Sequence, residues 1–503
     1  MAEARDVFDR IPHPGIVAWN ALVLGYAQNH QEEVALEIFS AMASRDSHSF
    51  VAALQACSNL AAREVGAFVS APELVVKWKS LERAMDLHSR ARAHGSFGSA
   101  TADLFVANAL IDVYAKCGSV RDAQAVFDAM AHRDVVSWTA LMLGYVQDGD
   151  GDFALELFQR MRRDRCRPNA LTFAAAVKAC SIIAAKNIDQ ALEMGEVLRT
   201  QASEAGFSSE LLVANTLIDM YVKCGYLRGA REVFHRIEHP DVVSWNTLLL
   251  GYVENGEIEQ ALRLFELMKS TNVAPDARTF AAVLKACAIV PRLETGREVH
   301  REICRRGLES KNEVLQSGLV DFYGKCGSMV DAEQLFYSIA STDPVTWTAL
   351  IAGYSRQGDH RGKVFEFFHK MVDEKVPASG PVLLCVLSAC SHAGLVDTGT
   401  KFFREMSSRF GVIPRIEHYH CVIDLLGRAN RLDEALDLIR GMPFEPRSVT
   451  WKTLLAACEK WENVDLARLA FGSSLGESEN GGGLEMEKGC GNYVLMSNIC
   501  RSG

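Results

Sequence analysis

Three stretches of the chain nearly repeat one another: VVSWTALMLGYVQDG at 135–149, VVSWNTLLLGYVENG at 242–256 and PVTWTALIAGYSRQG at 344–358. An earlier copy, IVAWNALVLGYAQNH, occupies 16–30. Trp138, Trp245 and Trp347 are 107 and 102 residues apart. Because shorter related copies lie between them, the sequence predicts sets of three repeats, each of about 31 to 41 residues.

Each repeat has the periodicity of two amphipathic helices joined by a turn. In the copy at 135–169, apolar residues recur at i, i+3, i+4 and i+7, which places them on one face of a helix. They are Trp138, Leu141, Met142 and Tyr145 in the first helix and Ala154, Leu157, Phe158 and Met161 in the second. A hairpin cannot bury such a face alone, so neighbouring hairpins must stack. The sequence therefore predicts an all-α fold of the α-solenoid type.

The fourteen cysteines follow the repeat, which argues against disulfides and zinc. Three lie in the tripeptide Lys-Cys-Gly, and five follow an alanine after an apolar run. We expect these eight to be small buried packing residues: Cys57, Cys117, Cys180, Cys224, Cys287, Cys326, Cys390 and Cys458. Cys-x-x-Cys, the usual zinc spacing, does not occur. We therefore expect no metal, no cofactor and a reducing compartment.

Composition sets further limits on function. Hydrophobic residues make up 49% of the 503 residues, but no apolar run approaches the roughly 18 residues that span a membrane. The first residues, MAEARDVFDR, resemble neither a signal peptide nor a transit segment. The net charge of −10 works against binding to nucleic acid, because phosphate contacts need Lys and Arg. The charge of the whole chain, however, says little about one groove.

The repeat resembles the pentatricopeptide repeat (PPR) more than the tetratricopeptide repeat. Glycine directly precedes tyrosine, as in Gly144-Tyr145 and Gly251-Tyr252, whereas a tetratricopeptide repeat places it directly after leucine. The copies at 135–169 and 242–276 have 35 residues and end in Arg-Pro-Asn and Ala-Pro-Asp. Their alternation with longer and 31-residue copies resembles the PLS subclass found in plant organelle RNA-editing factors. The resemblance covers most of the chain and implies a right-handed superhelical solenoid.

The resemblance also predicts the division of the chain. We expect a partial repeat at 1–15 and an E-type C-terminal extension at 448–503. Between them lie about twelve repeats, at 16–46, 47–103, 104–134, 135–169, 170–210, 211–241, 242–276, 277–312, 313–343, 344–379, 380–415 and 416–447. The segment at 58–80 has no counterpart in other copies and is interpreted as a surface insertion or a translated intron.

The C-terminal stretch favours an editing-type member that lacks its own deaminase. SVTWKTLLAACEKWENVDLARLA at 448–470 resembles the extension motif, and CGNYVLMSNI at 490–499 resembles the start of a second one. The extension of many relatives leads to a deaminase with His-x-Glu and Pro-Cys-x-x-Cys; this chain ends at Gly503, which is interpreted as truncation. His300-Arg301-Glu302 lacks a downstream Cys-x-x-Cys and is interpreted as part of a repeat helix. We expect no enzymatic activity.

Two side chains per repeat are the candidates for base recognition. By resemblance, they are the fifth residue of the first helix and the last residue of the repeat, here called the base-selecting pair. The fifth residue lies off the apolar stripe and has a short hydrogen-bonding side chain in every aligned copy. The pairs are Asn20 with Asp46, Asn108 with Asp134, Thr139 with Asn169, Asn215 with Asp241, Asn246 with Asp276, Ser317 with Asp343, and Thr348 with Ser379.

These residues also have an ordinary structural interpretation. Asp at a helix start is a common N-cap, and Asn or Thr on a helix can simply be solvated. Seven pairs restricted to these residue types favour recognition of bases. By the family's preferences, the predicted RNA is U-n-U-A-n-U-U-n-G, where n marks the longer repeats and Thr348 with Ser379 has no assignment. Arginines that could contact phosphate gather in one turn, although such charge runs are often solvated surface: Arg160, Arg162, Arg163, Arg165 and Arg167.

The leading hypothesis is a sequence-specific single-stranded RNA-binding factor for C-to-U editing in mitochondria or chloroplasts. It would recruit a separate deaminase through the C-terminal extension. A role in splicing or stability of organellar RNA remains open. A different class is a protein-binding scaffold of helical repeats; the recurring fifth-position side chains argue against it, because peptide grooves vary more between repeats.

Overall fold

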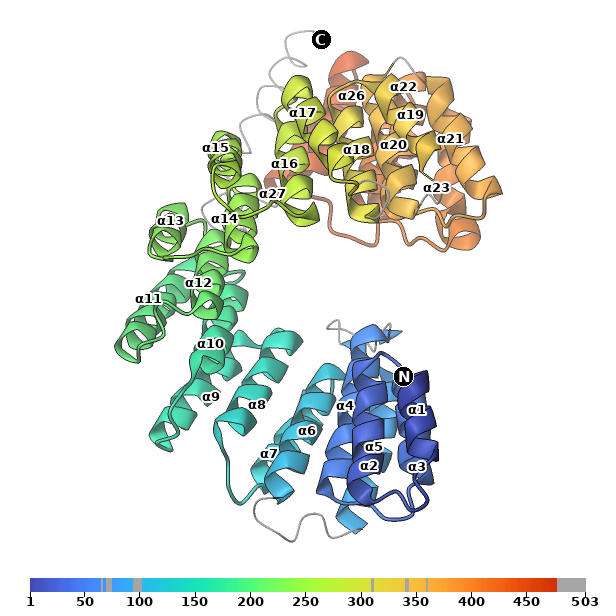
Figure 1. Cartoon of the computed structure of the whole chain (residues 1–503). Coiled ribbons are helices and arrows are strands. Elements are labelled where there is room, and N and C mark those ends of the chain that lie inside the picture. The colour runs from blue at the N-terminus through green and yellow to red at the C-terminus, as the bar shows by residue number, and fades with distance from the viewer. Residues whose placement is uncertain are drawn as a thin grey trace. The chain divides into compact units, whose positions relative to one another are not determined.

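The computed structural model describes residues 1–64, 67–68, 75–93, 102–308, 312–339, 343–358 and 361–476. These residues form 27 α-helices and one short antiparallel pair of strands, β1 (Ala67–Phe68) and β2 (Val75–Val76) (Figure 1). Ala67 pairs with Val76, and Phe68 with Val75. The predicted helical fold is confirmed, with this small β-ribbon as the one strand pairing in the described ranges.

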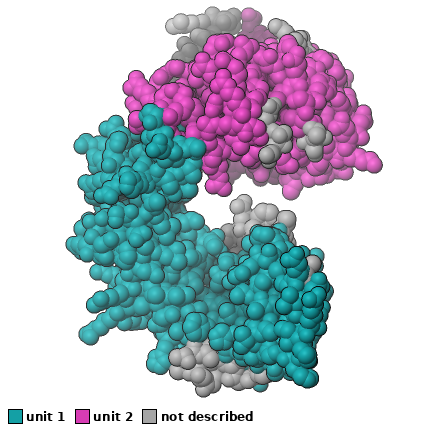
Figure 2. Space-filling model, viewed as in Figure 1, with its two compact units in different colours: residues 1–257, 270–274 teal, residues 258–269, 275–503 magenta. Residues whose placement is uncertain are grey.

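The chain forms two compact units: residues 1–257 with 270–274, and residues 258–269 with 275–503 (Figure 2). The first contains α1 (Ala2–Asp9), α2 (Ile16–Gln28), α3 (Glu32–Ala41), α4 (Ser47–Arg63), α5 (Trp78–Ala93), α6 (Ala102–Lys116), α7 (Val120–Ala129), α8 (Val135–Asp148), α9 (Gly151–Arg163), α10 (Ala170–Ile183), α11 (Ile188–Glu204), α12 (Leu211–Lys223), α13 (Leu227–His235) and α14 (Val242–Glu254).

The second unit contains α15 (Ile258–Lys269), α16 (Ala277–Ile289), α17 (Leu293–Arg305), α18 (Glu313–Lys325), α19 (Met329–Ser338), α20 (Pro344–Gln357), α21 (Arg361–Asp373), α22 (Gly380–Ala393), α23 (Val396–Phe410), α24 (Ile416–Arg428), α25 (Leu432–Arg440), α26 (Ser448–Lys460) and α27 (Val464–Gly476). None of the helices in the described ranges has the length and apolar character needed to cross a membrane.

Within each unit the hairpins stack in chain order. The first helix of one repeat packs against the first helix of the next, as α2, α4, α6 and α8 do in unit 1 and α16, α18, α20 and α22 in unit 2 (Figure 1). Second helices pack against their own first helix and against the following one, as α7 does with α6 and α8. Each unit is therefore an α-solenoid.

An aromatic contact joins successive repeats. The ring of Phe127, at the end of one repeat, meets that of Trp138 edge-on, with centroids 4.7 Å apart. Phe234 meets Trp245 in the same way at 4.8 Å, and Phe336 meets Trp347 at 4.6 Å. The tryptophans, predicted to lie on the apolar stripe, are buried. The repeated tryptophan thus seals the interface between neighbouring hairpins.

The glycine before each tyrosine lets the first helices approach closely. A Cβ atom on Gly144 would lie 2.9 Å from the Cβ of Ala115, and one on Gly251 would lie 2.3 Å from the side chain of Val222. Both distances are too short for ordinary contact, so close packing of the first helices requires glycine at these positions.

The segment at 58–80 is partly helical. Residues 58–63 belong to α4 and residues 78–80 to α5. Glu64 accepts hydrogen bonds from the backbone N–H groups of Lys79 (3.0 Å) and Ser80 (2.9 Å), and so caps α5. Of the C-terminal extension, α26 and α27 are described, whereas CGNYVLMSNI lies outside the described residues.

Candidate nucleic-acid interface

The last residue of each predicted base-selecting pair is the N-cap of the next repeat's first helix: Asp46 of α4, Asp134 of α8, Asn169 of α10, Asp241 of α14, Asp276 of α16, Asp343 of α20 and Ser379 of α22. The partner residue is the fifth of its own helix in six pairs. Asn108 is the seventh of α6 instead, because α6 begins at Ala102 rather than at residue 104.

The first pair is held together by hydrogen bonds across the repeat boundary. The Asn20 amide Nδ2 donates to Asp46 Oδ1 at 3.0 Å. Ser49, the third residue of α4, donates its backbone N–H to the same carboxylate oxygen at 2.8 Å and its hydroxyl to Asn20 Oδ1 at 2.7 Å. Asp46 is thus both a helix cap and the hydrogen-bond partner of Asn20.

The second pair repeats this geometry. Asn108 Nδ2 donates to Asp134 Oδ1 at 3.2 Å, the Ser137 backbone N–H donates to Asp134 Oδ1 at 2.8 Å, and the Ser137 hydroxyl donates to Asn108 Oδ1 at 2.6 Å. Asn20, Asn108 and their aspartates are half-buried. Each amide keeps one N–H, and each carboxylate keeps its Oδ2 atom, outside the three-residue network.

Thr139 and Asn169 form a different arrangement. The Thr139 hydroxyl donates to the backbone carbonyl of Val135 at 2.7 Å and lies 2.8 Å from the Thr172 hydroxyl. Asn169 Oδ1 accepts from the Thr172 backbone N–H at 2.9 Å, and its side chain is exposed. Thr139 is only 3% exposed. In this repeat the exposed amide group of Asn169 is therefore the better placed of the two to meet a ligand.

The Asn215–Asp241 pair is looser. Asn215 Nδ2 lies 3.4 Å from Asp241 Oδ1, and the Ser244 hydroxyl donates to Asp241 Oδ1 at 2.8 Å. Asn215 Oδ1 is buried and has no hydrogen-bond partner. Asn246 belongs to unit 1 and Asp276 to unit 2, so each is described by itself; Asp276 caps α16 by accepting from the Thr279 backbone N–H at 2.9 Å.

In unit 2 the pairs do not form the amide–carboxylate network. Ser317 donates to the carbonyl of Val314 at 3.2 Å, while Asp343 accepts from the Thr346 backbone N–H at 2.8 Å. The Thr348 hydroxyl lies 3.5 Å from that of Ser379, at the limit of a hydrogen bond. A hydroxyl group is too short to bridge the gap that an amide spans.

The hydrogen bonds also lower the pKa of the aspartate carboxylates. Burial raises the pKa of Asp46, but the Ser49 backbone N–H and the side chains of Asn20 and Ser49 outweigh it, so the pKa lies below its ordinary value. The pKa of Asp241 is lowered by the corresponding bonds from Ser244 and Asn215, again against a burial that raises it. Both side chains are therefore anionic acceptors at neutral pH.

Sequence reasoning missed a second recurring feature, an exposed apolar residue three positions before the fifth one. These side chains are 45–76% exposed. They are Val17, Phe105, Val136, Leu171, Leu212, Val243, Val314 and Val345. Each lies off the apolar stripe, and all but Val17 lie one residue before a buried residue. An apolar residue that recurs on the solvent-exposed side was the signal that could have found them.

Family models match most of the repeats that carry these pairs. The model described as the PPR repeat family matches residues 133–181 and 240–289, and the model described as the PPR repeat matches 17–47, 105–135, 213–239, 345–376, 383–409 and 417–444. A putative pentatricopeptide repeat-containing protein of Arabidopsis thaliana is 32% identical over 501 residues, which are 99% of this chain and 76% of that protein. This chain belongs to the PPR family.

Other comparisons agree with this membership. Another Arabidopsis PPR protein is 34% identical over 503 residues, all of this chain but 57% of its own length, so the chain spans little more than half of that relative. The crystal structure of the PPR protein PPR10 from maize matches 97% of this chain and 77% of its own, with a TM-score of 0.54 at 17% identity. That likeness shows a shared solenoid fold.

Neither the cysteines nor the His-x-Glu of this PPR protein forms a metal site within the described residues. Of the eight repeat-linked cysteines, seven are buried and Cys326 is half-buried. Burial raises the pKa of Cys57 and Cys180 to about 12, so these thiols are packing groups. His300 Nδ1 lies 2.8 Å from the Tyr323 hydroxyl, and Glu302 pairs with Arg306. Both residues lie in α17, the repeat helix in which the sequence places them.

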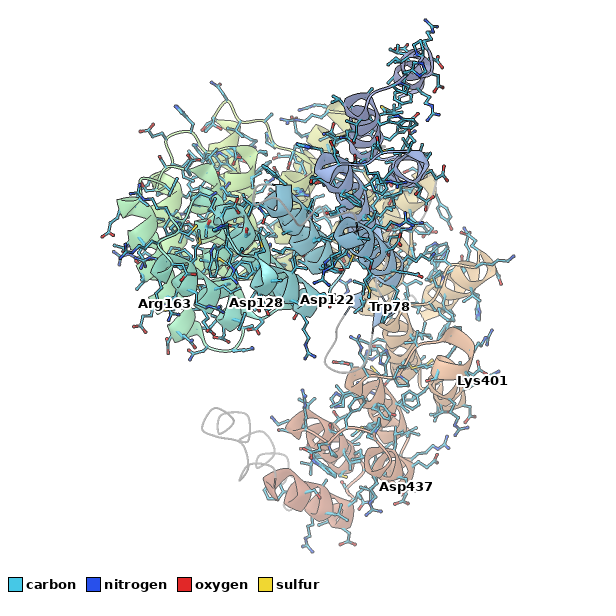
Figure 3. The ribbon with its side chains drawn as sticks, turned by 90° about the horizontal axis from the view of Figure 1, so that it is seen from below. Trp78, Asp122, Asp128, Arg163, Lys401 and Asp437 are labelled. Atoms are coloured by element: carbon cyan, nitrogen blue, oxygen red, sulfur yellow. The ribbon has the colours of Figure 1, made fainter. Side chains whose placement is uncertain are left out.

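The arginine cluster begins at the C-terminal end of α9, where Arg163 is labelled in Figure 3. Four of its members are exposed and Arg160 is half-buried, and no carboxylate in the described ranges pairs with them: Arg160, Arg162, Arg163, Arg165 and Arg167. The cluster is thus a local basic surface on an acidic chain, next to the Asn169 cap.

Proposed function

We propose that this PPR protein binds single-stranded RNA with sequence specificity, one base per repeat, through its base-selecting pairs. The observation that carries the proposal is the amide–carboxylate network, formed at the same position of two repeats by Asn20 with Asp46 and Asn108 with Asp134. Membership of the family supports it, and so does the maize PPR protein, which has been crystallised with an 18-nt psaJ RNA element.

The chemistry of the network favours uracil. Each pair retains one amide N–H donor and one carboxylate oxygen acceptor. Uracil offers carbonyl acceptors on either side of an N3–H donor, so it complements both groups. Cytosine offers an unprotonated N3 at that position, which would face the carboxylate and be repelled. One such pair supplies about 1–3 kcal/mol of discrimination on the DNA scale, so several repeats must act in register.

The exposed apolar residues fit the same proposal. Val17 lies three residues before Asn20, and Val136 lies three residues before Thr139. A base has two apolar faces as well as a hydrogen-bonding edge, so an apolar side chain beside each pair can cover a face while the pair contacts the edge. Arg163 and its neighbours supply cations for the RNA backbone.

The finer proposal is a PLS-type specificity factor with an E-type extension at 448–503, acting in C-to-U editing in mitochondria or chloroplasts with a deaminase supplied in trans. The alternation of repeat lengths and the motif at 448–470 support it. Several relatives are labelled chloroplastic or mitochondrial.

An exchange of base preference tests RNA recognition. The variant Asp134→Asn keeps a helix cap, because Asn caps about as well as Asp. It replaces the carboxylate with an amide that can donate to cytosine N3. We expect Asp134→Asn to weaken binding to U-n-U-A-n-U-U-n-G on the order of tenfold and to recover it when the second U is replaced by C. Gel-shift titration of both RNAs gives the dissociation constants.

Asp150→Asn is the matched control. Asp150 caps α9, the second helix of its repeat, through the Phe153 backbone N–H at 3.1 Å. It belongs to no base-selecting pair, so we expect the Asp150→Asn variant to keep the preference of the unaltered chain for U. Equal binding of both RNAs by the unaltered chain and by Asp134→Asn would exclude recognition through this pair.

Sequencing of organellar transcripts tests the editing role. In plants that lack this protein, we expect loss of C-to-U conversion at a site that lies downstream of the predicted RNA sequence. Unchanged editing together with altered splicing or abundance of a transcript would contradict the editing role and favour an RNA processing role instead.

A further inference from the structure

Buried hydroxyl groups recur at the third position of the first helices. Seven such residues are at most 2% exposed, although serine and threonine are ordinarily surface residues. They are Ser49, Ser137, Thr172, Ser244, Thr279, Thr346 and Thr450. The capping box explains part of this, because the hydroxyl accepts from the N-cap backbone N–H, as at Asp46 (3.1 Å).

A cap alone does not explain where the hydroxyl proton goes. Asp46 Oδ1 already accepts from the Ser49 backbone N–H and from Asn20 Nδ2. Ser49 Oγ lies 2.8 Å from this oxygen and 2.7 Å from Asn20 Oδ1. A hydroxyl has one proton, and the Asn20 oxygen is the acceptor left without another donor. The same argument places the Ser137 proton on Asn108 Oδ1, at 2.6 Å.

In the Asn215–Asp241 pair the serine hydroxyl does not donate to the amide oxygen, and the amide–carboxylate contact is longer. Ser244 donates to Asp241 Oδ1, and Asn215 Oδ1 is buried with no partner. The amide–carboxylate distance is 3.4 Å there, against 3.0 Å and 3.2 Å where the hydroxyl holds the amide. The chain therefore contains both a supported and an unsupported form of the same pair.

We propose that the third-position hydroxyl is a positioning residue for base selection. Ser49 and Ser137 each fix the amide plane of an asparagine in the preceding repeat, so that its free N–H points in one direction only. The base preference of a repeat then depends on three residues, of which the third-position hydroxyl belongs to the next repeat. The inference rests on the proposed RNA binding and deepens it: Asn20 and Asn108 discriminate U from C more sharply than Asn215.

Three variants test this inference. Ser137→Ala removes the hydroxyl, Ser137→Thr retains it, and Ser244→Ala removes a hydroxyl that does not hold the reading amide. Both alanine variants remove a hydroxyl that lies 2.8 Å from the Oδ1 atom of its N-cap aspartate, so the loss of that contact affects them alike. For each variant, dissociation constants are measured for RNAs with U or C opposite Asn108 and opposite Asn215.

We expect Ser137→Ala to lower the U-to-C ratio at its own nucleotide about fivefold, the effect of one typical hydrogen bond. Ser137→Thr should keep the ratio, and Ser244→Ala should change the ratio opposite Asn215 less than Ser137→Ala changes the ratio opposite Asn108. An unchanged ratio in Ser137→Ala, or an equal loss in both alanine variants, would overturn the inference. If the unaltered chain itself does not distinguish U from C, the proposed function fails as well, so the two failures are distinguishable.

Discussion

A single side chain in this protein combines a structural role with a proposed role in recognition. Asp46 ends one repeat, caps α4, and accepts a hydrogen bond from Asn20 of the repeat that it ends. The capping role favours a few residue types such as Asp, Asn and Ser at this position, and each offers a different set of donors and acceptors. The proposed code therefore uses few residue types at the last position, because few residue types cap a helix N-terminus well.

The pKa values of Asp46 and Asp241 predict a pH dependence of folding. Folding lowers both pKa values, so their contribution to stability is fully present above the unfolded value of about 3.9 and is lost as pH falls through the folded value. We expect the double variant Asp46→Asn/Asp241→Asn to lose less stability between about pH 5 and pH 3 than the unaltered chain. Urea midpoints at several pH values measure this.

Asp164→Asn provides the control for that comparison. Asp164 follows α9, is exposed, and belongs to no base-selecting pair. Its loss changes the net charge in the same direction without touching either network. A double variant that loses stability as steeply as the unaltered chain over the same pH range would contradict the assignment.

At the scale of helices and hairpins, periodicity was sufficient to predict most of the structure. The apolar stripe and the turn at Gly149 are local signals, and the fifth residue follows by counting from the first helix. The start of α6 differs from the expected first residue of the repeat, 104, because the helix begins at Ala102. Local pattern cannot detect such an extension.

Contacts between distant segments could not be predicted from the sequence. Glu64 caps α5 although the two are separated by the segment that has no counterpart in other repeats. The β1–β2 pairing involves only two residues on each strand, too few to give a sequence pattern. The burial of Thr139 depends on Thr172 of the next repeat, and the free oxygen of Asn215 depends on the direction of the Ser244 hydroxyl. Each needs the packing of two helices, which residue types alone do not specify.

At the scale of each whole unit, charge is balanced locally along the repeats. The lysines of the three Lys-Cys-Gly tripeptides, Lys116, Lys223 and Lys325, pair with an aspartate one turn earlier, at 2.7, 2.7 and 2.6 Å. Exposed pairs of this kind add only about 0.3–0.5 kcal/mol each. These pairs neutralise the lysines of the first helices. The arginines at and after the end of α9 have no such ion pairs within the described part of the chain, so their positive charge is not balanced locally.

The repeat architecture predicts how a core lesion spreads. Trp138 is 1% exposed, and its ring packs against Phe127 of the preceding repeat. Trp138→Ala should cost about 3–5 kcal/mol, as large-to-small core changes do. In a solenoid each hairpin contacts only its neighbours, so we expect hydrogen exchange to accelerate in α6–α10 while α22–α26 keep their protection.

Trp78, labelled in Figure 3 and 55% exposed at the start of α5, is the matched control site; Trp78→Ala should leave exchange nearly unchanged. Equal acceleration along the whole chain in Trp138→Ala would show that the array unfolds as a single cooperative body, because local coupling cannot carry a lesion through every repeat.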